Sequence, residues 1–180
     1  MNEGTMQDRL DRAIRKIPDF PKPGILFYDL TGILMNPAVY AECIQSLKEQ
    51  VIQLKGNALA AIEARGFLFA APLARELGIP LILVRKKGKL PGKTLSKTFD
   101  LEYGTDTIEV HREDVRPDFQ VVLVDDLIAT GGTLKAAISL IAEAGSRVVG
   151  VVSVVGLPFL SFREKLGDLP VYTLLEYHSE

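Results

Sequence analysis

The chain has 180 residues, with 21 Lys and Arg against 23 Asp and Glu, 47% apolar residues and 15 glycines, a balance typical of one compact globular domain. A chain of this length buries about 70% of the surface that its unfolded state exposes, so its core needs no disulfide or metal. A formal charge of −2 and an isoelectric point near 5.8 give no overall attraction for polyanions, which argues against a nucleic-acid partner.

The apolar runs of the chain are short. The longest, residues 148–157 and 81–84, fall well below the roughly 18 residues that a membrane span requires, and residues 1–10 are too polar for a signal peptide. We therefore expect a cytoplasmic protein with no membrane partner. The single cysteine, Cys43, lies at helical spacing from Leu47, which favours a small buried hydrophobe over a nucleophile.

The N-terminal third predicts two helices. Apolar residues recur at helical spacing up to Pro18, where proline ends a helix; they are Met6, Leu10, Ala13, Ile14 and Ile17. Three prolines within residues 18–24 predict an extended connection. A second helix is expected from Pro37, because proline is well tolerated at a first helical position. Its inner stripe is Tyr40, Cys43, Ile44, Leu47, Val51 and Leu54.

From residue 59 onward, short apolar runs alternate with helical segments. The expected strands are residues 59–62, 79–84, 121–124, 148–155 and 171–175, and the expected helices are residues 67–77 and 134–144. Both helices are followed by a glycine, Gly78 and Gly145, as a left-handed helix C-terminus prefers. This alternation predicts an α/β fold in which a parallel sheet is covered by helices on both faces.

One region interrupts the alternation. Residues 85–93, RKKGKLPGK, are basic and punctuated by glycine, and residues 94–111 read as two strands around Gly104 and Thr105. A long insertion inside a compact domain is usually functional. We interpret it as a hairpin lid over a site, with a structural hairpin and a solvated charge run as the alternative.

The strongest motif is VVLVDDLIATGGT at residues 121–133. A buried strand brings Asp125 and Asp126 to its carboxyl end, where open α/β sheets bind their ligands. Two glycines and two threonines follow at the start of a helix, whose free N–H groups can bind a phosphate. The motif lacks the lysine of a P-loop and the third glycine of a dinucleotide fold. It therefore predicts a ligand with hydroxyls or a metal beside its phosphate, such as a ribose 5-phosphate.

The same motif resembles the 5-phosphoribosyl-1-pyrophosphate (PRPP) binding motif of type I phosphoribosyltransferases. Four further segments resemble adenine phosphoribosyltransferases and occur in the order of that family. They are FPKPGILF at 20–27, EARGFLFA at 63–70, RKKGKLPG at 85–92 and LEYGTDTIEVH at 101–111. Together the five segments extend the resemblance over nearly the whole chain.

The resemblance implies one phosphoribosyltransferase domain over residues 1–180. An N-terminal hood over about residues 1–36 and a lid over about residues 85–111 would cover the carboxyl edge of the sheet. The implied reaction is adenine plus PRPP to AMP plus pyrophosphate, a step of purine salvage. Mg²⁺ would be bound mainly through PRPP, with no direct protein ligand, and the family implies a homodimer.

The resemblance also implies a set of site residues. Those expected at the ribose and its phosphate are Asp125, Asp126, Ala129, Thr130, Gly131, Gly132 and Thr133. Those expected at the pyrophosphate are Arg65, Arg85, Lys86 and Lys89. Those expected at adenine are Leu26, Phe27, Tyr28 and Leu127, with base recognition through the backbone and stacking on Phe27. Glu102 and Tyr103 are expected in the lid. The residues implied in catalysis are Glu102, as general acid or base, with Arg65, Asp125 and Asp126.

Two departures and two alternatives accompany this interpretation. Tyr28 stands where the family usually has arginine, and the peptide near Glu63 and Ala64 resembles one that is cis in related enzymes. A phosphoribosyltransferase for a 6-oxopurine or orotate would share the PRPP motif, but FPKPGILF argues against it. A PRPP-sensing transcription regulator would need a DNA-binding domain, and the segment before Phe20 is too short for a winged helix.

Overall fold

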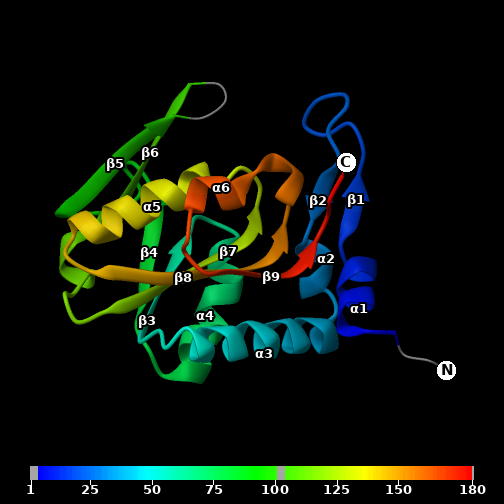
Figure 1. Cartoon of the computed structure of the whole chain (residues 1–180), viewed down its shortest axis with the longest axis horizontal. Coiled ribbons are helices and arrows are strands. Elements are labelled where there is room, and N and C mark those ends of the chain that lie inside the picture. Colours follow the sequence, from blue (N-terminus) through cyan, green and yellow to red (C-terminus); the bar gives the residue numbers. More distant parts are fainter. Residues whose placement is uncertain (1–3, 101–103, 180) are drawn as a thin grey trace.

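The computed structural model describes residues 4–100 and 104–179 and has a seven-stranded sheet as its centre (Figure 1). The strand order is β5-β6-β4-β3-β7-β8-β9. The bounds are β3 (Ala58–Ile62), β4 (Leu81–Lys86), β5 (Thr94–Asp100), β6 (Thr105–His111), β7 (Gln120–Ile128), β8 (Arg147–Gly156) and β9 (Val171–Glu176). The β4-β3-β7-β8-β9 pairs are parallel, and β5 and β6 add an antiparallel edge.

Helices cover both faces of this sheet (Figure 1). Helices α3 (Pro37–Gln53) and α4 (Gly66–Leu77) pack on one face, and α5 (Gly132–Glu143) and α6 (Phe162–Leu166) pack on the other. Neighbouring strand residues point to opposite faces, so Leu59 belongs to the first core and Ala60 to the second. The predicted α/β fold is confirmed; α6 was not predicted.

Strand β7 is longer than predicted. It runs from Gln120 to Ile128 instead of ending at Val124, because β8 stays paired with it as far as Gly156. Asp125 and Asp126 therefore lie in the last part of the strand itself. The two expected glycines do follow their helices in a left-handed conformation, with φ of +66° at Gly78 and +100° at Gly145.

The N-terminal prediction was wrong for residues 14–24. Helix α1 (Met6–Ala13) ends early, and β1 (Arg15–Ile17) pairs antiparallel with β2 (Phe27–Asp29). The proline-rich segment is the turn of this N-terminal hairpin and not an extended connection: Asp19 and Gly24 have positive φ, and the Gly24 N–H donates to Asp19 Oδ1 over 2.8 Å. A short helix, α2 (Thr31–Leu34), follows.

The expected second helix, α3, begins at Pro37 as predicted. Cys43 is fully buried within it, and burial raises the pKa of its thiol to about 12. The thiol is therefore protonated and packed as a hydrophobe, as the sequence predicted. In the part of the chain that the structure describes, no helix is both long and apolar enough to span a membrane.

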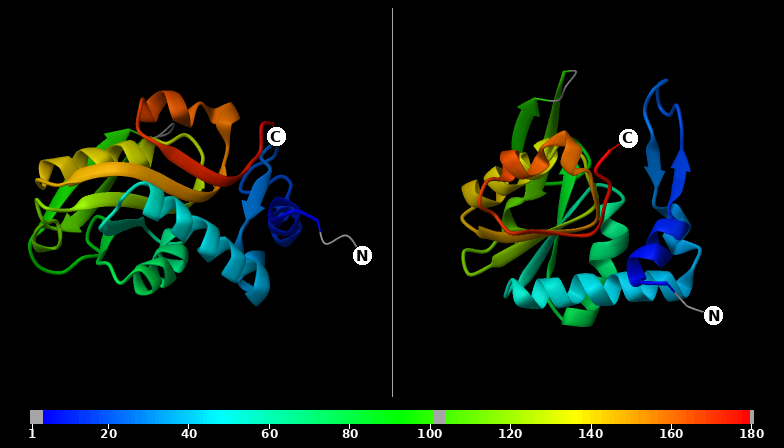
Figure 2. Two further views of the ribbon diagram at one scale, coloured as in Figure 1. Left: turned by 60° about the horizontal axis from the view of Figure 1, so that its bottom comes forward. Right: turned by 45° about the vertical axis from the view of Figure 1, so that its right-hand side comes forward.

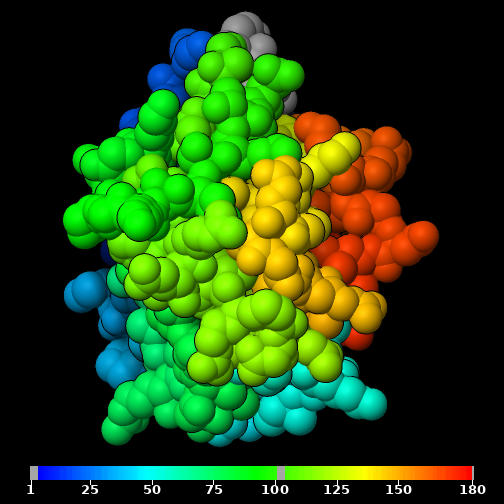
Figure 3. Space-filling view, turned by 90° about the vertical axis from the view of Figure 1, so that its left-hand side faces the viewer, coloured from blue at the N-terminus to red at the C-terminus, as the bar shows by residue number. Residues whose placement is uncertain are grey.

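Two hairpins rise on the same side of the molecule, β1–β2 and β5–β6 (Figures 1 and 2). The two strands predicted around Gly104 are confirmed. The base of this hairpin is part of the main sheet, since β6 pairs with β4 through Glu109 opposite Arg85. Lys97 of β5 forms an ion pair with Glu143 of α5, and Figure 3 shows the green surface on this side of the molecule directly beside the yellow to orange surface.

Candidate active site

The sheet reverses its strand order between β3 and β7. The helix that follows β3 crosses one face of the sheet, and the helix that follows β7 crosses the other. Ligands of open α/β sheets bind at such a point, outside the carboxyl ends of the strands. A cavity of about 340 Å³ lies there. Its lining consists of Ile62, Glu63, Ala64, Arg65, Val84, Lys86, Asp106, Ile108, Asp125, Asp126, Leu127 and Thr133.

Two adjacent carboxylates form the floor of this cavity. Asp126 is only 3% exposed, and its backbone N–H donates to Asp125 Oδ1 over 2.9 Å. Arg65 Nε lies 2.6 Å from Asp126 Oδ2. Apart from this ion pair, that oxygen has no hydrogen-bond partner in the described part of the chain. A buried acceptor of this kind is suited to a ligand that brings hydrogen-bond donors.

The pKa values of the two carboxyls follow from their burial. Burial and the neighbouring charge of Asp126 raise the pKa of Asp125 well above its usual range. Burial also raises the pKa of Asp126, while the Arg65 guanidinium opposes that shift. Two ionised carboxylates in one buried site repel each other. Ligand hydroxyls that donate to them would relieve this cost.

Arg65 joins the carboxylate pair to the N-terminal hairpin. It directly precedes α4, and the peptide between Glu63 and Ala64 is cis, as the resemblance implied. The Arg65 guanidinium lies 5.7 Å from the ring centre of Phe27 in β2. The residue after Arg65 must be small, because a Cβ at Gly66 would lie 2.9 Å from the Val124 carbonyl oxygen. Glycine thus lets α4 start close to β7, which brings Arg65 to Asp126.

The turn from β7 into α5 has the geometry of a phosphate cradle. Ala129 and Thr130 form a bend, Gly131 adopts φ of +76°, and α5 begins at Gly132. The first N–H groups of a helix have no partner inside the helix and point toward its N-terminal side. Thr133 lines the cavity, so this helix start opens onto the site that contains the two carboxylates.

The basic segment reaches the cavity through one of its expected residues. Lys86 lines the cavity and pairs with Asp106 over 3.1 Å. Arg85 instead donates to both carboxylate oxygens of Glu63, over 3.3 and 3.2 Å, and to the Lys89 carbonyl over 3.1 Å. Neither Arg85 nor Lys89 is part of the cavity wall. The Arg85 side chain thus links the end of β3 to the loop after β4.

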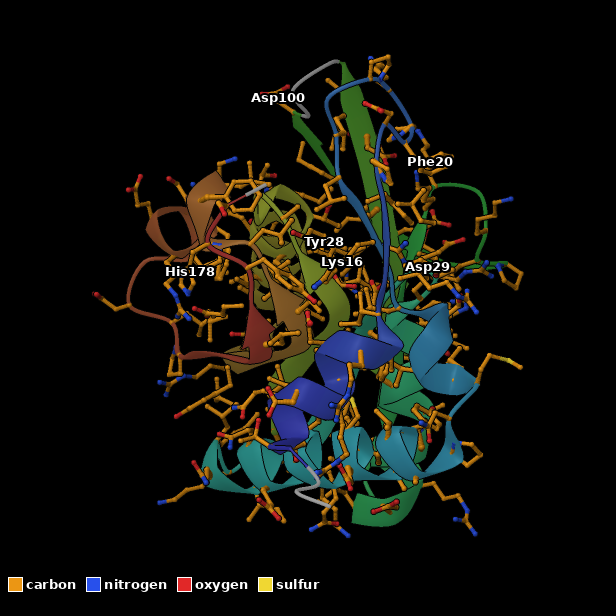
Figure 4. All side chains as sticks on the ribbon, turned by 90° about the vertical axis from the view of Figure 1, so that its right-hand side faces the viewer. Lys16, Phe20, Tyr28, Asp29, Asp100 and His178 are labelled. Atoms are coloured by element: carbon orange, nitrogen blue, oxygen red, sulfur yellow. The ribbon has the colours of Figure 1, made fainter. Side chains whose placement is uncertain are left out.

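The expected base residues lie in two places. Leu127 lines the cavity, and Phe27 lies beneath Arg65. The Tyr28 side chain is only 4% exposed and stacks on Tyr177, with ring centres 4.1 Å apart. It points toward the C-terminal segment, while Asp29 lies on the other side of the hairpin (Figure 4). Leu26 packs against the same core. The Tyr28 side chain therefore belongs to the core.

Two expected lid residues, Glu102 and Tyr103, lie outside the described residues.

Two charged residues of the cavity wall, Glu63 and Asp106, were not predicted. Glu63 follows β3 directly, so the rule that selected Asp125 could have found it. Asp106 carries no such signal, because only the pairing of β6 with β4 brings it to Lys86.

Comparisons with known proteins identify the family of the chain. A family model described as the phosphoribosyl transferase domain matches residues 30–165. A curated adenine phosphoribosyltransferase of Treponema denticola is 60% identical over 176 residues, which cover 97% of this chain and 93% of that protein. This chain belongs to the adenine phosphoribosyltransferase family. The resemblance seen in the sequence is thereby confirmed.

Solved structures of adenine phosphoribosyltransferases share the fold. The enzyme of Thermoanaerobacter pseudethanolicus has a TM-score of 0.92 at 43% identity, with 96% of this chain and 100% of that chain covered. The Saccharomyces cerevisiae enzyme, crystallised with adenine and an imino-altritol bisphosphate, has a TM-score of 0.88 at 37% identity, with 94% and 98% covered. These matches confirm the type I phosphoribosyltransferase fold class.

Proposed function

We propose that the protein transfers the 5-phosphoribosyl group of PRPP to adenine, which forms AMP and releases pyrophosphate, as in purine salvage. The observation that carries this proposal is the cavity that joins Asp125, Asp126, Arg65 and the start of α5 at the strand-order reversal. The names of the relatives support the same reaction.

In this proposal the ribose and its phosphate occupy the cavity beside β7. The ribose hydroxyls donate hydrogen bonds to the buried carboxyl oxygens of Asp125 and Asp126, which need such donors. The 5-phosphate accepts hydrogen bonds from the backbone and hydroxyls of the turn into α5. The residues assigned to this cradle are Ala129, Thr130, Gly131, Gly132 and Thr133.

The pyrophosphate would lie between Arg65 and Lys86. Both line the cavity, and both are cations that can stabilise the charge that develops as the leaving group departs. Arg85 and Lys89 would contact pyrophosphate only if the loop after β4 rearranged, because Arg85 is paired with Glu63. We therefore assign Arg85 and Lys89 a secondary role at this subsite.

Mg²⁺ fits this site as a companion of PRPP. Among the described residues no group of three or more acidic, histidine or cysteine side chains could hold a metal ion, so the phosphate oxygens would supply most ligands. When bound, Mg²⁺ would neutralise charge on the pyrophosphate. The protein residues bind and orient the substrates around it.

At the base site, adenine would stack on Phe27 with Leu127 on its other face, and the backbone of Leu26 and Tyr28 would pair with the purine edge. Bond breaking between ribose C1 and the pyrophosphate oxygen would run ahead of bond formation from purine N9, as in glycoside chemistry. The N9 proton would pass to the carboxylate of Glu102, the proposed general acid or base, with Tyr103 beside it in the lid sequence.

We further propose that about residues 1–36 act as a hood and about residues 85–111 as a lid, in a single domain over residues 1–180. The two hairpins that rise on one side of the molecule support this arrangement (Figure 2). A cytoplasmic homodimer is also proposed. The exposed apolar side chains Met35 and Leu68, 77% and 42% exposed, support association with another subunit.

A direct assay tests the proposed function. The purified protein is incubated with adenine, PRPP and Mg²⁺, and both AMP and pyrophosphate are measured. We expect the two products in equal amounts. If PRPP binds by calorimetry but no AMP forms, the protein is a PRPP sensor and the proposed function is wrong.

The cradle predicts a specific effect of Gly131→Ala. A side chain at φ of +76° is strained by about 1–2 kcal/mol, and its Cβ would lie 3.2 Å from Phe162 Cβ. We expect a lower melting temperature and a raised KM for PRPP. Gly78→Ala is the matched control, since Gly78 has φ of +66° with nothing within 4 Å of an added Cβ. It should lose stability with an unchanged KM; equal KM values in both variants would contradict the cradle.

The lid proposal predicts protection from protease. Trypsin cleavage between Arg85 and Val110 should slow when PRPP and Mg²⁺ are bound, because closure over a ligand orders a segment. Cleavage after the exposed Lys55, in the turn that follows α3, serves as the internal control and should not change. Equal cleavage of the hairpin with and without ligand would favour a rigid structural hairpin.

A further inference from the structure

The two ends of the chain meet at one side chain, Tyr177, which follows β9. Its hydroxyl donates to Asp11 Oδ1 of α1 over 2.6 Å, and its ring stacks on Tyr28 of β2 at an interplanar angle of 15°. Lys16 of β1 completes the group, with Nζ 2.7 Å from Asp11 Oδ1 and 5.1 Å from the centre of the Tyr177 ring. Figure 4 shows Lys16 and Tyr28 close together on the side of the C-terminal segment. Tyr177 thus contacts three successive N-terminal elements.

Tyr177 is itself fixed to the main sheet. Its backbone N–H donates to the Gly156 carbonyl at the end of β8 over 3.1 Å. The N-terminal hairpin is not part of that sheet: in the described residues, β1 and β2 pair with each other in a separate two-stranded sheet. The orientation of this hairpin relative to the cavity therefore depends on side-chain packing, and Tyr177 provides part of it.

The hydrogen bond of Tyr177 joins a neutral donor to an ionised acceptor. Burial and the bond to Asp11 raise the pKa of Tyr177, which keeps its hydroxyl protonated. The Lys16 and Tyr177 hydrogen bonds lower the pKa of Asp11, which keeps it ionised. Hydrogen bonds to a charged group are stronger than neutral ones. The contact is therefore present throughout the neutral pH range.

The effect on the site follows from strand geometry. Phe27 and Tyr28 are neighbours in β2, so their side chains point to opposite faces. When Tyr28 is stacked on Tyr177, the Phe27 ring is directed to the other face. There it meets Phe20 edge-on, with ring centres 5.0 Å apart, and lies beneath the Arg65 guanidinium. Loss of the Tyr177 contact would remove a restraint on the Tyr28 side chain and therefore on the orientation of the Phe27 ring.

We propose that Tyr177 is a positioning residue for the base site: it holds β2 so that Phe27 is presented to the purine, and it thereby sets the affinity for adenine. This inference rests on the proposed function for the identity of the base. It also gives a structural reason for tyrosine at position 28, where the family usually has arginine, because an aromatic ring there completes the stack.

Steady-state kinetics of three variants test this proposal. In Tyr177→Leu, we expect the KM for adenine to rise about tenfold or more, since small displacements of a binding group cost this much, while the KM for PRPP stays within about twofold. Tyr177→Phe keeps the stacked ring and loses only the hydroxyl, so its KM for adenine should lie between those of Tyr177→Leu and the wild type. Tyr172→Leu removes a 38% exposed tyrosine from β9 itself and is the control; it should match the wild type.

Hydrogen exchange gives a second readout that does not depend on activity. Backbone amides of residues 15–29 should exchange faster in Tyr177→Leu, while those of β3 and β7 remain protected. If Tyr177→Leu does not fold, Tyr177→Phe and Asp11→Asn carry the same comparison. An equal rise of both KM values, or unchanged exchange in the hairpin, would overturn the positioning role. Absence of AMP formation by the wild type would instead overturn the proposed function, and the exchange result would still decide the role of Tyr177.

Discussion

Asp125→Asn and Asp126→Asn are each expected to lower kcat/KM for PRPP by about 100-fold while the fold stays intact. Each change replaces a carboxyl group that would accept hydrogen bonds from the ribose hydroxyls, and a hydrogen bond to a charged group contributes up to about 3 kcal/mol. Steady-state kinetics with PRPP varied measure this effect. Asp118→Asn, at an exposed carboxylate outside the cavity, is the control and should behave as the wild type. Wild-type kinetics in both cavity variants would contradict their assigned role.

The raised pKa of Asp125 leads us to expect that one of these variants, Asp125→Asn, is more stable than the wild type. The pKa of Asp125 is higher in the folded state than in the unfolded state. The contribution of this carboxyl to the stability of the fold is therefore complete below the unfolded pKa near 3.9. That contribution is lost as the pH rises through the folded pKa. Asp125→Asn should therefore melt higher than the wild type at pH 8, by roughly 2–4 °C for each kcal/mol. The difference should shrink as the pH falls toward 4. A melting temperature below that of the wild type at pH 8 would show that the charge does not destabilise the fold.

Base specificity is the second large effect. If the backbone of residues 26–28 pairs with the purine edge, its donor and acceptor are fixed by the main chain. A 6-oxopurine would leave a buried carbonyl unpaired, and sites built around hydrogen bonds reject such analogues by as much as about 10⁴- to 10⁵-fold. We expect kcat/KM for hypoxanthine and guanine to be at least about 10³-fold below that for adenine.

Kinetics with each base in turn measure this ratio. Tyr28→Phe is the matched variant, because it keeps the ring that packs on Tyr177, and it should leave the ratio unchanged. Comparable use of hypoxanthine by the wild type would remove the adenine assignment and leave the PRPP assignment in place.

The sequence predicted the elements whose structure depends on residues close together in the chain. From residue 58 onward, apolar runs and glycine-ended helices predicted the order of the strands and of every α-helix except α6. The motif at residues 121–133 located the carboxylates and the start of α5. The prediction failed at residues 14–17, whose helical spacing was overridden by pairing with Phe27–Asp29. That pairing depends on a turn of prolines that reads locally as an extended linker.

Long-range partners limited the prediction of the site. Arg85 and Lys86 look alike in the sequence, yet Glu63, from the end of β3, takes up Arg85 and leaves Lys86 to the cavity. The family resemblance implied Tyr28 as a base-site residue through its backbone. Its side chain lies in the core because Tyr177, at the other end of the chain, stacks on it. Neither partner is visible in the local sequence.

A crystal structure of the protein with AMP tests the central claim most directly. We predict the phosphate of AMP within hydrogen-bond distance of the backbone N–H groups of residues 130–133, the ribose hydroxyls against Asp125 and Asp126, and the adenine ring on Phe27. AMP bound outside the cavity at the ends of β3 and β7, or with its base at the Gly131 turn and its phosphate at Phe27, would contradict the account.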